Sequence, residues 1–145
     1  MLARFIAILA ILAATVMPLR ADVTIVSDPD QWIDQALQKI SEGKTDDFAR
    51  DFLKMIDQPN SFDSFAGNLR ILSQLGAPAF MDKVVDVKFG DVLREVVYVA
   101  LYRRTDYVYF KFTIKKNVGG WLISNFAFKN ETSNLFPPDF APPPH

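Results

Sequence analysis

Three side chains in the second half of the chain, Asp86, Tyr98 and Tyr102, could perform acid–base chemistry. A carboxylate in an apolar cavity can remove a proton, and a tyrosine hydroxyl can donate a hydrogen bond to the oxyanion that then forms. An isomerase, dehydratase or cyclase built this way needs no cofactor. We therefore take Asp86 as the candidate catalytic base and Tyr98 or Tyr102 as the candidate oxyanion donor.

The residues around Asp86 nevertheless favour a structural or solvated role for its carboxylate. Side chains alternate between the two faces of a strand, which places Asp86 on the face opposite an apolar set. That set is Val85, Val87 and Phe89. If the apolar set meets the core, Asp86 is exposed. We therefore favour a non-catalytic protein and keep the enzyme as the alternative.

The cysteine and histidine content narrows the possible chemistry. The chain has no cysteine, and its single histidine is the final residue, His145. Thiolate catalysis, cysteine metal sites and disulfides are therefore excluded. A lone terminal histidine also argues against a histidine-centred triad and a histidine-rich metal centre. We expect no cofactor and no metal.

The first 21 residues have the form of a secretory signal. Arg4 supplies positive charge, residues 5–17 are apolar, and Ala21 is a small residue before the expected cleavage site. A membrane-spanning helix needs about 20 apolar residues, so this run is too short. We expect a periplasmic or secreted protein that contacts the membrane only through an uncleaved signal.

The remaining chain is mildly acidic. Removal of Arg4 and Arg20 lowers Lys plus Arg from 16 to 14, against 17 Asp plus Glu, which leaves a net charge of about −3. Nucleic-acid phosphates favour proteins with clustered Lys and Arg. We therefore expect no nucleic-acid partner.

The hydrophobic pattern predicts helices first and strands afterwards. Helical spacing and end signals, such as Asp28-Pro29 at a start and Gly43 at an end, predict helices over residues 28–43, 45–56 and 61–76. Alternating segments predict strands over residues 84–89, 93–104, 107–116 and 121–129. The short breaks between them permit only antiparallel neighbours. The predicted fold is α+β, with three N-terminal helices packed on a curved, cone-like, four-stranded antiparallel sheet.

Length and composition indicate a single domain over residues 22–135. Residues 136–145 form a proline-rich tail. Proline lacks the amide donor that a central strand requires. We expect an extended, loose terminus, with a polyproline ligand for a partner as the alternative.

The alternation in residues 107–116 defines two faces of the predicted sheet. Val108, Phe110, Phe112 and Ile114 should meet the helices, and a sheet curled around those helices would form an apolar concavity. We take Phe110, Phe112 and Trp121 as candidate pocket residues for a small apolar or amphipathic ligand.

Tyrosines mark the opposite, outer face of the predicted sheet. Tyr98, Tyr102, Tyr107 and Tyr109 would form one amphipathic surface, because a tyrosine can bury its ring and keep its hydroxyl in water. We take Tyr98, Tyr107 and Tyr109 as interface candidates for a homodimer.

Two segments carry a resemblance to a known superfamily. In ALQKISEGKTDDFARDFL a helix ends at a glycine and an acidic turn opens the next helix, and GGWLISNFAF forms a closing strand. Together with the order of elements over about residues 30–130, they resemble the nuclear-transport-factor-two-like superfamily, which has the cystatin-like fold. The resemblance implies a cone of curved sheet, frequent dimers, and either enzymes or non-catalytic binders. It assigns no catalytic residue here.

The favoured function is an exported, non-catalytic binding or interaction module with an apolar concavity for a small molecule. Two alternatives stay open. One is a cofactor-independent isomerase, dehydratase or cyclase, and the other is an envelope accessory protein that binds another chain. A fold alone does not separate these functions.

The expected secretory signal predicts where the exported protein begins. We expect protein recovered from its host to begin at Asp22 or within one or two residues of it, because the apolar run is too short to remain as a stable span. Amino-terminal sequencing of the purified protein measures this. Intact Met1 in the membrane fraction would contradict it.

Overall fold

The protein is described by a computed structural model that places residues 23–103 and 106–130. The expected signal, residues 1–21, and the proline-rich tail, residues 136–145, lie outside these ranges. The described elements are α1 (Pro29–Ser41), α2 (Thr45–Met55), the short 3-10 helix η1 (Pro59–Ser61), α3 (Phe62–Leu75), β1 (Phe80–Phe89), β2 (Leu93–Tyr102), β3 (Asp106–Asn117) and β4 (Gly120–Lys129). None of the helices in this part of the chain is long and apolar enough to cross a membrane.

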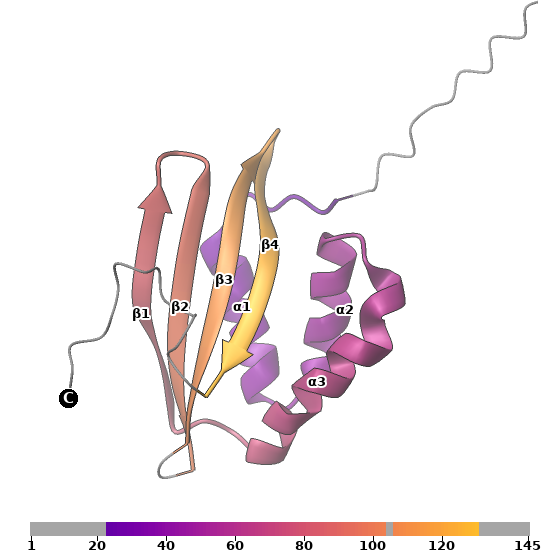
Figure 1. Ribbon diagram of the computed structural model, residues 1–145, viewed down its shortest axis with the longest axis vertical. Coiled ribbons are helices and arrows are strands. Elements are labelled where there is room, and N and C mark those ends of the chain that lie inside the picture. The colour runs from indigo at the N-terminus through magenta and orange to yellow at the C-terminus, as the bar shows by residue number, and fades with distance from the viewer. Residues whose placement is uncertain (1–22, 104–105, 131–145) are drawn as a thin grey trace, which may run out of the picture.

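The architecture is a helical layer on one face of a sheet (Figure 1). The four strands are hydrogen-bonded in the order β1-β2-β3-β4, and all neighbours are antiparallel. Helices α1 and α2 both contact β4. The predicted α+β fold with three N-terminal helices and a four-stranded antiparallel meander is therefore confirmed.

Local sequence signals explain where α1 begins and ends. The Asp28 side chain accepts a hydrogen bond of 3.0 Å from the Gln31 amide, and Pro29 occupies the first helical position. Gly43 has φ +74°, and the Lys44 amide beyond it bonds back to the Lys39 carbonyl at 2.8 Å. This is the glycine-terminated helix end that the sequence predicts.

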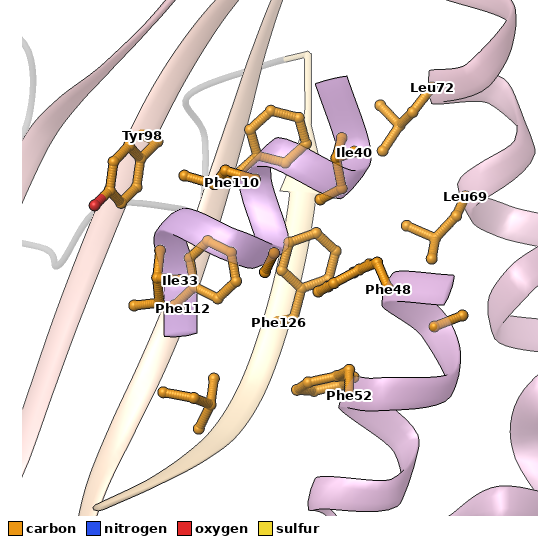
Figure 2. Close-up of a cluster of buried hydrophobic side chains, with 14 of the residues drawn as sticks. Ile33, Ile40, Phe48, Phe52, Leu69, Leu72, Tyr98, Phe110, Phe112 and Phe126 are labelled. Atoms are coloured by element: carbon orange, nitrogen blue, oxygen red, sulfur yellow. The ribbon is translucent and has the colours of Figure 1, made fainter. Parts of the chain in front are cut away.

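Phenylalanine rings join the sheet to the helices. Phe126 on β4 lies 4.8 Å from the ring of Phe48 and 5.1 Å from that of Phe112, measured between ring centroids. Figure 2 shows Phe126 between the strand rings, Phe110 and Phe112, and the ring of Phe48 on α2. Phe48, Phe110 and Phe112 are fully buried. The middle of the concave face is thus a packed core.

Strand pairing confirms one predicted face assignment and corrects another. Phe110 and Phe112 face the helices as expected. Tyr98 lies opposite Phe110 in the ladder, so it shares that inner face and is only 7 % exposed. Tyr102 is fully buried within the same core cluster. The prediction of one outer surface carrying all four tyrosines is therefore wrong, and Tyr98 does not belong to an outer interface.

The predicted faces of β1 are also reversed. Asp86 pairs with Val96, which belongs to the helix-facing core, whereas Val85 pairs with Val97 on the outer side. A bulge between Lys83 and Val85 shifts the register, and β1 is the sheet edge farthest from α2 and α3 (Figure 1). Since those two helices do not reach β1, its apolar residues need not face inward.

The segment before α1 extends the sheet beyond β4. Val26 forms an isolated antiparallel bridge with Trp121, and the two residues exchange backbone hydrogen bonds of 2.8 Å. Gly120 permits this approach, because a Cβ at that position would lie 2.6 Å from the Ile25 side chain and 2.7 Å from the Val26 carbonyl oxygen. The bridge holds Trp121 in place at one end of the sheet.

The packing around Phe126 predicts a large energetic difference between two phenylalanines. Phe126→Ala should lower the free energy of unfolding by about 3 to 5 kcal/mol, because it removes a ring enclosed by other rings. Phe89→Ala should cost about 1 kcal/mol or less, because Phe89 is 43 % exposed on the edge strand. Urea denaturation of both variants measures this. Equal losses would contradict the core assignment.

Candidate functional site

Within the described residues, packed side chains fill the middle of the sheet face that meets the helices. Phe110 and Phe112, expected as pocket residues, are both 0 % exposed and pack against Phe126. They line neither of the grooves described below. Helices that pack directly on the sheet replace the expected concavity with a core, so the candidate sites lie at the two ends of that core.

One end carries a groove, here called the apolar groove, between α3 and the sheet. Its volume is about 510 Å³. Leu72 and Val108 are buried in its wall, whereas Ile71 is 55 % exposed and Tyr107 is 46 % exposed. The remaining lining residues are Leu75, Asp106, Phe128, Lys129 and Asn130. Apolar walls with a few polar groups at the rim suit an amphipathic molecule.

The other end carries a smaller groove, here called the charged groove, beside the start of α1. Its volume is about 310 Å³, and Trp121 lines it. The Lys116 ammonium group lies 6.0 Å from the centroid of the Trp121 ring. Further lining residues are Pro29, Asp30, Lys88, Gly90, Asp91, Leu93 and Arg94. Of the three expected pocket residues, only Trp121 lines one of these two grooves.

A network of charges, here called the Arg94 clamp, borders the charged groove through Asp30 and Arg94. The Arg94 guanidinium donates bonds of 2.7 and 2.9 Å to Asp30 at the start of α1. It also donates a 2.7 Å bond from Nε to Asp86 on β1. Lys83 adds a 3.0 Å bond to Asp30. The clamp therefore ties the first helix to the first two strands.

The Arg94 clamp changes what Asp86 can do. The Arg94 hydrogen bonds lower the pKa of Asp86 and lower that of Asp30 to about 2, while these carboxylates raise the pKa of Arg94. A general base works best with a pKa near the operating pH. Asp86 is held ionised by its partner, so the structure gives it the features of an ion-pair member instead of those of a tuned base.

The two candidate oxyanion donors lie at different distances along β2 from Asp86. Lys83 lies opposite Tyr98, and its ammonium group is 5.7 Å from the centroid of the Tyr98 ring and 3.6 Å from an Asp86 oxygen. Burial raises the pKa of Tyr98. Tyr102 ends β2, where it pairs with Asp106 near the apolar groove. The structure thus gathers Asp86 and Tyr98 around Lys83 and leaves Tyr102 apart.

The Tyr102 hydroxyl is buried and has no hydrogen-bond partner among the described residues. Desolvation raises the pKa of this phenol to about 12. Tyr102 lines neither groove. Its packing in the core cluster accounts for its burial.

The described residues contain no group of three or more His, Asp or Glu side chains arranged to hold a metal ion.

Of the three interface candidates, Tyr107 and Tyr109 pair with Leu101 and Val99 on the outer face. That placement agrees with the alternation in the sequence.

Sequence reasoning missed both the Arg94 clamp and the apolar groove. Arg94 and Asp30 are 64 residues apart, and no local pattern links them. The wall of the groove combines α3 with the start of β3 and the end of β4. Ile71 gave the one available signal, because it is a large apolar residue that falls between Leu69 and Leu72 of the buried stripe.

Comparisons with known proteins return no relative: no family model, no curated protein and no solved structure matches this chain.

The Arg94 clamp predicts a specific pH dependence of stability. A carboxyl whose pKa is lowered on folding stabilises the protein above its unfolded pKa, and this stability is lost as pH falls through the folded pKa. Asp30, at about 2 against an ordinary 3.8, should therefore lose its contribution between pH 4 and pH 2. We expect a loss of about 1 kcal/mol over this range, after allowing for the partial exposure of the pair.

Arg94→Met tests this assignment against Arg50→Met, which breaks an exposed pair with Asp47. Arg94→Met should cost about 1 to 2 kcal/mol at pH 7 and flatten the fall between pH 4 and pH 2. Arg50→Met should leave the fall intact. Urea denaturation from pH 7 to pH 2 measures both, and the same steep fall in the Arg94 variant would contradict the clamp.

Proposed function

We propose that this protein is an exported, non-catalytic binding module that holds a small apolar or amphipathic molecule in the apolar groove. The carrying observation is a groove of about 510 Å³ between α3 and the sheet, lined by Ile71 and Tyr107, which are 55 % and 46 % exposed. Exposed large apolar side chains that line a concave surface are typical of a ligand site.

The chemistry of the groove supports a ligand with an apolar body and a polar end. Leu72, Leu75 and Phe128 supply apolar contact surface, and Lys129 and Asn130 lie at its rim. A volume of this size falls within the range of about 300 to 1,000 Å³ that small-molecule sites occupy. A medium-chain carboxylic acid or alcohol fits both the size and the polarity.

The Arg94 clamp supports binding over catalysis. Asp86 accepts hydrogen bonds from Arg94 that lower its pKa, and it lines neither groove. An isomerase or dehydratase would need its base beside the substrate. Among the described residues that line the apolar groove, Asp106 is the single carboxylate.

We infer further that the chain is a distant member of the nuclear-transport-factor-two-like superfamily. Three helices followed by an antiparallel meander support this. One feature departs from that superfamily, because the short strands that its members have between the second and third helices are replaced here by the short η1 helix. The inference concerns the fold, and the groove carries the proposed function.

Binding is tested with decanoate and decanol as probes, measured by isothermal titration calorimetry. Ile71→Lys should weaken the binding of decanol at least tenfold, because a charge on the exposed wall of the groove opposes an alkyl chain. Val118→Lys provides the matched control, since Val118 is 90 % exposed in the turn between β3 and β4. This control should bind like the parent.

Extraction of protein purified from its host, followed by mass spectrometry, tests the same proposal without a chosen probe. We expect an alkyl acid or alcohol in the parent and its loss in Ile71→Lys. Binding of decanol that neither substitution changes would contradict the groove assignment. A turnover activity abolished by Asp86→Asn in a stably folded variant would establish the enzyme alternative instead.

A further inference from the structure

We propose that the outer face of the sheet is the docking surface for the chain's own C-terminal segment, residues 131–145. The outer face is the side away from the helices, and its central residues are Val85, Val97, Val99, Leu101, Tyr107 and Tyr109. This surface borders the proposed ligand site, because Tyr107 also lines the apolar groove, but the docking proposal rests on other observations.

The burial of the outer face is the first observation. Val97 is 0 % exposed and Val85 is 5 % exposed, although neither belongs to the core cluster between sheet and helices. Within residues 23–103 and 106–130, no helix lies on that side of the sheet (Figure 1). Two valines excluded from water on this face imply a covering layer.

The sequence of β2 is the second observation. Residues 96–101, VVYVAL, form an unbroken apolar run. A strand with one face in water alternates apolar and polar residues, whereas a strand covered on both faces reads as a continuous apolar run. The inner face of β2 meets the helices, so the run predicts that a second layer also covers its outer face.

The end of the described chain places the C-terminal segment within reach. Lys129 pairs with Tyr109, so the Lys129 side chain lies on the outer face one residue before the described chain ends. Three strand spacings of about 4.8 Å separate β4 from β1. Fifteen residues in polyproline conformation extend about 45 Å, at 3.1 Å per residue, and so cover that distance with length to spare.

The chemistry of the segment fits a face better than a sheet edge. It carries Leu135, Phe136 and Phe140 among five prolines. Prolines cannot donate to a strand ladder, so such a segment binds through its side chains. Proline-rich peptides dock on aromatic surfaces, and Tyr107 and Tyr109 supply one on this face. Leu135 and the two phenylalanines add apolar area for Val97 and Val99.

The absence of cysteine allows a direct test in the full chain, in the form that the host exports. A nitroxide spin label is attached through Ala141→Cys, and methyl signals are recorded by NMR. We expect the methyl signals of Val97 and Val99 to lose more than half their intensity. Those of Leu53 and Leu69, in the helical layer, should keep most of theirs. The control carries the same label with Phe136→Ser and Phe140→Ser, and should restore the outer-face signals.

A mixed sample separates docking within one chain from pairing of two chains. Spin-labelled protein without isotopes is combined with isotope-labelled protein without a spin label. Unchanged intensities in the mixture support docking within one chain. Loss of the Val97 and Val99 signals in the mixture would assign the outer face to a second copy and overturn the proposal. Equal broadening of both layers in the single-chain sample, or none, would also overturn it.

Discussion

The packing of Phe126 against Phe48 determines where open space can exist in this protein. A four-stranded antiparallel sheet with one strongly apolar face is stable only when another layer covers that face. Here the cover rests on β4, where Phe126 meets α2. The helices therefore fill the middle of the concave face and leave its two ends as grooves. The fold thus produces end grooves in place of a deep central cavity.

The two ends of the core differ in what they leave unsatisfied. At the charged end Arg94 has ion-pair partners, whereas at the apolar end large apolar side chains remain exposed to water. Arg94 bonds Asp30 and Asp86, so the charges of the Arg94 clamp already have partners. At the apolar end, Ile71 and Tyr107 keep about half of their surface in water. Water contact with large apolar side chains is the unfavourable state that a ligand relieves. The physical asymmetry of the two ends therefore directs the functional proposal to the apolar groove.

The outer face of the sheet also carries side chains that have little contact with water. Glu95 and Lys111 pair there at 2.9 Å, and both side chains are less than one-fifth exposed. A charged pair with so little contact with water lies beside Val97, which is fully buried. An ordinary solvated sheet face keeps such charges exposed. Around Val97 and the Glu95–Lys111 pair, the outer face thus has the burial of an interior surface, whereas Tyr107 on the same face is 46 % exposed.

The sequence by itself determined the three helices, the order of the four strands and the inner face of β3, but it placed the start of β1 at residue 84, whereas the strand begins at Phe80. Strict alternation in residues 108–114 sufficed there, because only one register buries every phenylalanine. In β2 the run VVYVAL is apolar at every position, so alternation carries no information about its faces. Pairing with β3 decided that Tyr98 lies opposite Phe110 and faces the helices. The partners of Asp86 and the walls of the apolar groove were likewise decided only in three dimensions, because they join residues that no local periodicity connects.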